Sequence, residues 1–599
     1  MVYFESKKRG GPARIGVLET GKKEIETPCI IDEAVEINDK ESLWFSSKSP
    51  KKEINILPSK TSPNYVPEDV AEYFGKQNIK IESNLDEKRI ISPVIGGGNW
   101  PDLRKKLADN APKSEIITIE SLKKLRVQDE FIKIISKIRE TVNENTAIFA
   151  PGIATPQNLS FFVYLGIDLF DSTLASLEAS RDIYLTKNGS EPLNYLKELT
   201  CCCPICSNLD IEQIRAKEKQ KRTKLLEKHN KNILNQEIKT IRNYIKKEEF
   251  REYVEKNVRS TPYLTAGLRN LDKIHYDYLE KRTPTFEQTR VLANTVDSLN
   301  RPQIKRFRER VLERYSPPTS DIAVLLPCSA KKPYSRSKTH RIISSALRDI
   351  GNQMIVTSPL GLVPRELEIT YPAQHYDIPV IGEWFDDEKK MIKNLIKNYF
   401  SKNRFEKIIV HLDGELLGPI KKIFNQLGME PKFTSKNRDP RSRKSLKQLK
   451  KEINGFNGIN SERETIRSLC NYQFGDQEGE SFIKDTQIRG RYPKLILHAN
   501  NKQLAAISPQ YGALSLTIRG AEKINTSNYE VKIGSFYPEG SVLAPGVIQA
   551  SEKIRPNDEV IFYGEKAFGV GRAKMSGFEM EESDRGIAIK TRHVKEIQT

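Results

Sequence analysis

Short runs of branched apolar residues alternate with helical patterns through residues 11–195. The run over residues 89–95 precedes a helical pattern near 101–109, and Ala147–Ala150 precedes another over Thr155–Leu165. Strands that alternate with helices build βαβ units. The pattern therefore predicts a parallel sheet, either open or closed into a barrel, whose sites would lie at the carboxyl ends of the strands.

A second α/β region centres on the apolar run Ile322–Leu326. This run is too short and too rich in branched residues for a helix, so it predicts a buried strand. Thr339–Leu347 then shows a helical pattern that Ser337 would cap and Gly351 would end. Because Cys328 lies between strand and helix, we expect one thiol at a strand-to-helix turn, where open α/β sheets place their ligands.

Two further strands, Met354–Thr357 and Ile408–Leu412, extend this central α/β domain, which we place at residues 316–430. Polar or strained residues follow each of them. Parallel strands end at one edge of a sheet, so four more side chains are expected to converge on Cys328 in a shared crevice. They are His375, Asp377, Glu383 and Asp413.

The C-terminal part of the chain has a different pattern. Residues 521–599 alternate apolar and polar positions between Gly, Pro and Asn turns, which is typical of a small β-barrel. Residues 431–520 hold a basic run, Lys436–Lys451, expected to be an exposed linker or an RNA contact, and then a small mixed domain. With a first domain at residues 1–315, the chain is predicted to be an α/β multidomain protein.

The charge balance narrows the class of partner. The 599 residues include 98 Lys and Arg against 79 Asp and Glu, a formal net charge of +19. Such a chain is expected to bind a partner rich in phosphates, with nucleic acid the first candidate and a membrane surface its rival. No apolar run approaches the roughly 20 residues that span a bilayer, and the N-terminus lacks the apolar core of a signal peptide. We therefore expect a soluble, cytoplasmic protein.

Four of the seven cysteines crowd into residues 201–206, which argues for a metal site in a reducing compartment rather than for disulfides. Cys201, Cys203 and Cys206 with His229 would make a closed Cys₃His tetrahedron, the usual composition of structural zinc. Cys202 is expected to point away, or else to replace Cys201. The alternative is a loop of reduced thiols without a metal.

The neighbours of Cys328 favour a reactive thiolate over a buried core residue. Free cysteine is usually buried. Here, however, the next dozen residues supply cations, hydroxyls and an imidazole that a core position does not require. Lys331 and Lys332, or the helix N-terminus, would lower the pKa of the thiol below its ordinary value of about 8.5.

The spacing of Pro327-Cys328, Lys332-Pro333-Tyr334, Ser337 and His340 resembles the signature of the archaeosine synthases, archaeal paralogues of the tRNA-guanine transglycosylases. The resemblance implies modification of tRNA that carries 7-cyano-7-deazaguanine at position 15, by addition of an amine to the nitrile to give an amidine. Cys328 would form a thioimidate that the amine displaces, while Lys332 keeps the thiolate charged and His340 moves protons. Tyr334 and Ser337 would orient the substrate. Alternatively, Cys328 only binds and the amine attacks directly.

Two amine donors stay open under this resemblance. The family is associated with glutamine-derived nitrogen and also with transfer of free lysine, which a radical SAM partner enzyme later cleaves. The sequence shows no separate glutaminase domain and no second catalytic Cys-His pair, so we favour lysine. The family's barrel commonly dimerises, which makes a homodimer an expected assembly.

Residues 10–28, 96–104 and 152–172 resemble parts of the transglycosylase barrel, and Asp171 lies where that barrel has its nucleophilic aspartate. The cysteine cluster also resembles its zinc site. Two departures argue against base exchange: no Asp-Ser-Gly-Gly motif is present, and Gly96 replaces a glutamine that hydrogen-bonds the base. We therefore expect a degenerate TIM-barrel-like domain in which Asp171 supports the structure or positions tRNA.

Residues 540–576 resemble a PUA domain, an RNA-binding module, in which Arg555, Arg572 and Arg592 are candidates for contacts to a tRNA stem or 3′ end. Two functions from other classes remain as alternatives. A true transglycosylase would exchange bases through Asp171. A non-catalytic tRNA-binding paralogue would bind tRNA without help from the thiol and form no product.

Overall fold

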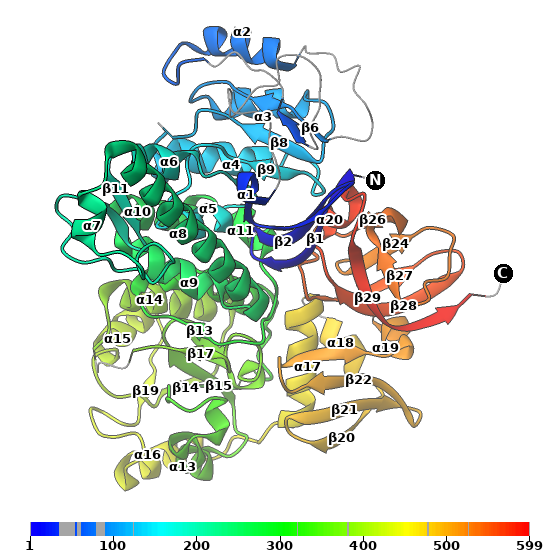
Figure 1. Cartoon of the computed structure of the whole chain (residues 1–599). Coiled ribbons are helices and arrows are strands. Elements are labelled where there is room, and N and C mark those ends of the chain that lie inside the picture. The colour runs from blue at the N-terminus through cyan, green and yellow to red at the C-terminus, as the bar shows by residue number, and fades with distance from the viewer. Residues whose placement is uncertain are drawn as a thin grey trace. The chain divides into compact units, whose positions relative to one another are not determined.

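The computed structural model describes residues 2–34, 54–56, 62–79, 90–123, 125–319, 321–379, 383–475, 478–524 and 526–597. The chain divides into two compact units, each described by itself below (Figure 1). The first comprises Met1–Arg282 with Glu582–Gly586, and the second comprises Thr283–Glu581 with Ile587–Thr599. In these described ranges, no helix combines the length and the apolar character needed to cross a membrane.

A parallel sheet of five short strands lies at the centre of the first unit, in the order β4, β10, β9, β8, β7. The helix α3 (Pro101–Asp109) follows β7, α4 (Ile132–Arg139) follows β8, and α5 (Leu159–Tyr164) follows β9. The predicted alternation of strands and helices is confirmed, and the five strands form half of a barrel. Their bounds are Cys29–Ile30 for β4, Val94–Ile95 for β7, Ile116–Ile119 for β8, Ala147–Phe149 for β9 and Leu169–Phe170 for β10.

An N-terminal antiparallel sheet is tied to the half-barrel by buried ion pairs. Arg14 donates to both carboxylate oxygens of Asp168 at 2.8 and 2.9 Å, and it lies 3.2 Å from Glu144 Oε2. Because Asp168 directly precedes β10, this pair fixes the strand that leads to Asp171. The N-terminal strands are β1 (Val2–Gly10), β2 (Ala13–Thr20) and β3 (Glu24–Thr27).

The rest of the first unit is mainly helical, and its longest helix is α8 (Lys219–Lys247). Leu234, Ile238, Ile241 and Ile245 recur on α8 at three- and four-residue spacing and are buried in the core of this unit. This apolar stripe fixes the orientation of the helix and thereby the direction of His229. The remaining elements are α1 (Ile31–Ala34), β5 (Ile54–Ile56), α2 (Glu68–Ile79), β6 (Ile90–Ser92), α6 (Thr173–Ser180), β11 (Ile183–Thr186), β12 (Gly189–Pro192), α7 (Ile211–Arg215), α9 (Phe250–Asn257), α10 (Pro262–Ile274) and α11 (Tyr276–Arg282).

The second unit begins with a five-stranded sheet ordered β16, β15, β14, β18, β19, in which only β16 is antiparallel. Alternate residues of its central strand face opposite sides: Ile322, Val324 and Leu326 pack under α13 (Lys338–Leu347) and α16 (Arg443–Ile453). The other face packs against α12 (Pro302–Arg314), α14 (Asp386–Lys402) and α15 (Leu417–Gln426). The strands are β14 (Ile322–Pro327), β15 (Asn352–Thr357), β16 (Gly361–Pro364), β18 (Lys407–Val410) and β19 (Lys432–Phe433).

Two segments that the sequence placed outside the central domain fold with this sheet. In residues 283–315, β13 (Val291–Leu292) pairs with β17 (Tyr376–Asp377), and α12 packs on the sheet. Residues 443–453 form α16 rather than an exposed linker. The reason is that Leu449 and Ile453, four residues apart among the lysines, give the segment one apolar face that the sheet buries.

Two smaller sheets complete the second unit. A four-stranded antiparallel sheet consists of β20 (Gln487–Arg491), β21 (Lys494–Ala499), β22 (Lys502–Ser508) and β23 (Ala513–Leu516), with α17 (Ser461–Phe474), α18 (Glu478–Ile483) and α19 (Ile518–Lys523) beside it. The predicted short C-terminal strands are present as one six-stranded sheet. Its strands are β24 (Glu530–Ile533), β25 (Ser541–Leu543), β26 (Val547–Ala550), β27 (Glu559–Tyr563), β28 (Ala567–Ala573) and β29 (Ile587–Glu596), with α20 (Gly577–Glu582) inserted before the last.

Candidate active site and metal centre

Cys328 lies directly after β14, the middle strand of the central sheet, as the sequence predicted. Its side chain is exposed and lines a cavity of about 360 Å³. This volume falls in the range that small-molecule sites occupy. Asn294, Ser358 and Trp384 line the same cavity, so the thiol faces a space that has both polar and aromatic walls.

The protein atoms around Cys328 act on its ionisation in opposite directions. Although the side chain is open to the cavity, the surrounding protein atoms partly desolvate the sulfur and thereby raise the pKa of the thiol, while the Lys332 ammonium and a hydrogen bond from Thr357 lower it. Burial also lowers the pKa of Lys332, against the opposing pull of the Asp377 carboxylate. Burial is the largest of these effects, so the net pKa of Cys328 is raised, and the expectation that nearby cations or the helix N-terminus would bring it below its ordinary value is wrong. Lys332 and Thr357 oppose this rise and are the groups that favour the thiolate.

A chain of hydroxyl groups leads from Thr357 into the core. The Tyr376 hydroxyl lies 2.7 Å from Thr357 Oγ1 and 2.6 Å from the hydroxyl of Tyr334, which is fully buried. Lys332 Nζ lies 3.9 Å from the centre of the Tyr376 ring. Sequence reasoning missed Thr357, which ends β15, and Tyr376, which begins β17.

Two residues of the sequence motif hold the turn that carries Cys328. Ser337 caps α13 as predicted, because its Oγ accepts a hydrogen bond from the His340 backbone N–H at 3.1 Å. His340 is fully buried: its Nε2–H donates to the Pro327 carbonyl at 2.9 Å, and its Nδ1 accepts from Arg365 at 2.8 Å. Burial and the nearby guanidinium lower the pKa of His340 to about 3. With both ring nitrogens occupied, His340 positions the turn and has no free nitrogen to carry a proton.

The four side chains expected to converge on Cys328 do so unequally. Glu383 lines the same cavity, and the Asp413 carboxylate acts on the thiol electrostatically. Asp377 acts on Lys332. His375 does not line this cavity; its ring lies against Tyr371, with ring centres 5.9 Å apart.

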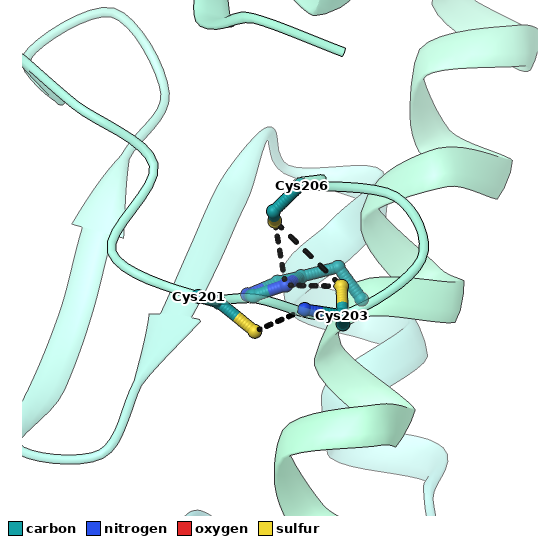
Figure 2. A group of neighbouring side chains, drawn as sticks. Cys201, Cys203 and Cys206 are labelled. Atoms are coloured by element: carbon teal, nitrogen blue, oxygen red, sulfur yellow. Dashed lines mark hydrogen bonds between the residues drawn. The ribbon is translucent and has the colours of Figure 1, made fainter. Parts of the chain in front are cut away.

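The predicted metal ligands converge in the first unit, where Figure 2 shows the three cysteine side chains pointing toward one another. Cys201, Cys203, Cys206 and His229 offer ligand atoms that all lie within 4.8 Å of one another. Cys203 Sγ lies 3.7 Å from Cys206 Sγ, and His229 Nδ1 lies 3.5 and 3.4 Å from these sulfurs. Tetrahedral zinc with bonds of about 2.3 Å to sulfur and about 2.0 Å to nitrogen would separate its ligands by roughly the same distances. The donor set therefore fits such an ion.

The residues around His229 prepare it for a metal. Its Nε2–H donates to the Leu185 carbonyl at 2.9 Å, which leaves the Nδ1 lone pair toward the sulfurs. The Tyr184 ring stacks on the imidazole with 3.7 Å between ring centres. Burial lowers the pKa of His229 to about 4, so the ring is neutral at pH 7. Cys202 is exposed, in agreement with the prediction that it points away from the other cysteines.

Asp171 is enclosed by its own unit. It is 3% exposed, its Oδ1 accepts from the Gly152 N–H at 2.7 Å, and its Oδ2 accepts from the Thr173 hydroxyl. Burial raises the pKa of Asp171 to about 6, with a smaller contribution from the Asp32 carboxylate. Both carboxylate oxygens are thus engaged within the protein.

The turn that begins at Gly96 leaves little room for a longer side chain at position 96. A Cβ atom at position 96 would lie 2.6 Å from Glu120 Oε1, so the Glu120 carboxylate occupies the space into which a glutamine would extend. Arg104 is fully buried and donates to the carbonyls of Gly98 and Ile95 at 2.7 and 3.2 Å. A longer side chain at position 96 would therefore require the Glu120 carboxylate to move.

The three arginines predicted to contact RNA have partners inside the second unit. Arg592 donates to both carboxylate oxygens of Glu559 at 2.5 Å. The Arg572 guanidinium lies 4.8 Å from the centre of the Phe286 ring. Arg555 donates to the carbonyl of Glu552 at 2.6 Å. Each of them contributes to the structure of the C-terminal sheet region.

Comparisons with protein families divide the chain into four matched parts. The family model described as queuine tRNA-ribosyltransferase matches residues 62–263, and the PUA domain matches residues 536–595. The patch-forming domain C2 of tRNA-guanine transglycosylase matches residues 464–529. A domain of unknown function matches residues 304–453, the part that contains Cys328.

The chain is also similar to a protein of solved structure and to a transglycosylase. A crystal structure of a protein of unknown function is 34% identical and covers 48% of this chain and 99% of its own, with a TM-score of 0.41. The tRNA-guanine(15) transglycosylase of Methanosphaera stadtmanae is 25% identical over 87% of this chain and 78% of its own length.

Two archaeosine synthases are similar over nearly the full chain. The archaeosine synthase of Haloferax volcanii is 34% identical over 99% of both chains. The archaeosine synthase subunit alpha of Methanosarcina acetivorans is 38% identical over 99% of this chain and 100% of its own length. On this full-length similarity, the chain belongs to the archaeosine synthase family.

Proposed function

We propose that this protein takes part in archaeosine biosynthesis by adding an amine to the nitrile of 7-cyano-7-deazaguanine in tRNA. The observation that carries the proposal is the exposed thiol of Cys328 at the wall of a cavity of about 360 Å³, with Lys332 and Thr357 beside it. The names of its relatives and the transglycosylase and PUA family matches support tRNA as the substrate. The name of one relative, tRNA-guanine(15) transglycosylase, supports position 15 as the target.

The proposed chemistry has two steps that balance. The Cys328 thiolate attacks the nitrile carbon, so a C–S bond forms, one C–N π bond breaks, and the nitrogen takes up a proton to give a thioimidate. The amine then attacks the same carbon, the C–S bond breaks, and the thiolate leaves with loss of one amine proton. The net result is addition of the amine across the nitrile, which gives a substituted amidine and regenerates the thiolate.

The neighbouring residues support these steps in different ways. Lys332 holds positive charge near the thiolate and near the developing charge on the nitrile nitrogen, and Thr357 donates to the sulfur. Tyr334, Ser337 and His340 position the turn around Cys328 rather than contact substrate.

The acidic side chains near the cavity are the proposed binding groups for the cationic amine donor, which we take to be lysine. Glu383 lines the cavity, and Asp377 and Asp413 act on Lys332 and on Cys328. Carboxylates attract an ammonium group, whereas the amide nitrogen of glutamine is neutral. His375 remains proposed only as a nearby substrate contact.

The other modules have supporting roles in this proposal. Zinc at Cys201, Cys203, Cys206 and His229 would hold the hairpin β11–β12 on α8. Asp171 would support the half-barrel, which keeps the shape of a base-exchanging domain without its activity.

The proposal also covers the domains of the chain, its oligomeric state and a partner enzyme. The chain keeps four parts in this proposal: a transglycosylase-like domain, a central α/β domain that also takes in residues 283–315 and 443–453, a small mixed domain and a PUA domain. Arg555, Arg572 and Arg592 contribute to the RNA-binding module. A homodimer and a radical SAM partner that cleaves the lysine adduct complete it.

The test is mass spectrometry of nucleosides from tRNA that carries the cyano base, after incubation with wild-type protein and lysine or glutamine. We expect a mass gain equal to lysine with wild type and no gain with Cys328→Ala. A nucleoside mass gain equal to ammonia in the presence of glutamine would identify glutamine, rather than lysine, as the amine donor. No gain with either donor, together with retained tRNA binding, would contradict the catalytic proposal and favour a binding paralogue.

A second measurement separates a covalent thiol from one that only binds. Wild-type protein incubated with cyano-tRNA in the absence of amine, then digested with nuclease and protease, should yield a Cys328 peptide that carries the modified nucleoside. A turnover-competent enzyme that never shows this adduct would favour direct attack by the amine.

A further inference from the structure

The helix α16 presents an unbalanced set of positive charges to solvent. Its only acidic residue, Glu452, pairs with Lys407 at 2.9 Å. Within the described ranges, the exposed cations of α16 form no ion pair with a carboxylate. They are Arg443, Lys444, Lys447, Lys450 and Lys451.

The beginning of α16 lies at the same edge of the sheet as Cys328. Residues 434–442 follow β19, which runs in the same direction as β14 through the shared neighbour β18. His411, at the end of β18, holds this loop: its Nδ1 accepts from Thr434 Oγ1 at 2.8 Å, and its Nε2–H donates to the Pro440 carbonyl at 3.0 Å. The Asp413 carboxylate, two residues further on, acts electrostatically on Cys328 and is itself affected by Arg441.

The other end of α16 points to the opposite edge of the sheet. The chain after the helix reaches residues 349–350, just before β15 begins, where Ile459 N–H donates to the Asp349 carbonyl at 2.8 Å. Eleven helical residues span roughly 16 Å. The charges of α16 are therefore graded: Arg443, Lys444 and Lys447 lie toward the thiol edge, and Lys450 and Lys451 lie away from it.

We propose that the first two turns of α16 bind the phosphates of the tRNA strand on either side of the target nucleotide, while its base enters the Cys328 cavity. A base must leave its stack to reach a thiol at the wall of a cavity, so the backbone beside it has to be held nearby. Exposed lysine and arginine side chains bind phosphates without reading sequence. The identity of the base rests on the proposed function. The assignment of the surface rests on the exposed positive charges of α16 and on their place at the sheet edge that carries Cys328.

The experiment compares two matched pairs of substitutions on the same helix in the full-length protein. Lys444→Gln/Lys447→Gln removes two charges near the thiol edge, and Lys450→Gln/Lys451→Gln removes two charges at the far end. Affinity for the tRNA is measured from 50 to 200 mM salt. We expect the first pair to weaken binding about tenfold or more at 0.1 M salt and to lower the slope of log affinity against log salt by about 1.5. The second pair should change affinity less than about twofold.

Equal effects of the two pairs, or a larger effect of the far pair, would overturn the proposal. All four lysines are exposed, so neither pair is expected to change the melting temperature, which is measured as the control for folding. Kinetics give a second criterion. The first pair should raise KM for tRNA and leave kcat unchanged, because the lost phosphate contacts stabilise the bound substrate and the transition state equally.

Binding is also measured with tRNA that lacks the cyano base, and in the Cys328→Ala background. Suppose that Lys444→Gln/Lys447→Gln weakens binding in these two experiments while wild type transfers no amine to cyano-tRNA. The proposed phosphate-binding surface is then supported and the proposed chemistry is contradicted. If wild type forms product but both pairs behave like wild type, the chemistry stands and the surface fails.

Discussion

Two candidate nucleophiles, Asp171 and Cys328, each directly follow a strand, in two different sheets. Asp171 follows β10 of the half-barrel, and Cys328 follows β14 of the central sheet. Asp171 is 3% exposed and accepts hydrogen bonds from Gly152 and Thr173. Cys328 is exposed to a cavity and has a cation and a hydroxyl group beside it. The strand end is thus closed in one unit and open in the other.

The difference shows that a strand end makes a site available but does not make it active. A reactive group also needs space for the substrate and neighbours that stabilise its charged form. Beside Gly96 in the half-barrel, the Glu120 carboxylate lies where a longer side chain would extend. Of the two strand ends, the one in the central sheet therefore fits the proposed catalytic role better.

The largest expected effect comes from substituting each candidate nucleophile in turn and measuring product formation in the same assay. Cys328→Ala should lower product formation by at least about 10³-fold, since loss of a covalent nucleophile removes the main path. Asp171→Asn should stay within about fivefold of wild type, because the asparagine oxygen can still accept from the Gly152 N–H and its NH₂ can donate to the Thr173 hydroxyl, which then reverses its role. The measurement is nucleoside mass spectrometry at saturating amine. An inactive Asp171→Asn beside an active Cys328→Ala would reverse the comparison.

Removal of the metal should affect the first unit and spare the thiol of the second. We expect about one zinc per chain by elemental analysis, and loss of that zinc in Cys206→Ser with a Tm lower by roughly 5–10 °C. The rate at which iodoacetamide alkylates Cys328, followed by peptide mapping, should not change. Cys202→Ser is the matched control, because Cys202 is exposed beside the cluster and should leave the zinc in place. Zinc retained by Cys206→Ser would contradict the assigned ligands.

The hydroxyl of Thr357 offers a finer test of what controls the ionisation of Cys328. Its hydrogen bond lowers the pKa of Cys328, so Thr357→Val should raise that pKa and reduce the thiolate fraction at pH 7.5. Loss of one hydrogen bond to a charged group should slow alkylation about tenfold at this pH. The pH profile of alkylation should move to higher pH, and Thr357→Ser should restore it. An unchanged profile in Thr357→Val would remove Thr357 from the site.

The smallest expected effect concerns stability of the turn that carries Cys328. Burial lowers the pKa of His340 from 6.5 to about 3, so between these values the unfolded chain takes up a proton that the folded chain does not. Stability from this group is complete above pH 6.5 and decreases as the pH falls below it. Wild type should lose about 2–4 °C more in Tm than His340→Gln when the pH is lowered from 7 to 5. Equal losses in the two proteins would show that folding does not lower the pKa of His340.

Much of the architecture was readable from local sequence patterns. The branched run Ile322–Leu326 can only be a short buried strand, and Ser337 before a helical pattern is an N-cap, because both depend on neighbours within a few residues. The metal ligands were predictable for a similar reason: three cysteines within six residues can reach one ion whatever the rest of the chain does. The sequence motif likewise predicted the place of Cys328 at a strand-to-helix turn, where its thiol is exposed to a cavity.

Only the tertiary structure decided which side chains face that cysteine and which face the core. Thr357 and Tyr376 come from strands remote in sequence, and the register of β14 with β15 brings Thr357 to the sulfur. His340 looked like a proton carrier until its two nitrogens were seen to bind Pro327 and Arg365. Sequence spacing records contacts along the chain, whereas hydrogen-bond occupancy and access to a cavity depend on elements that meet only after folding.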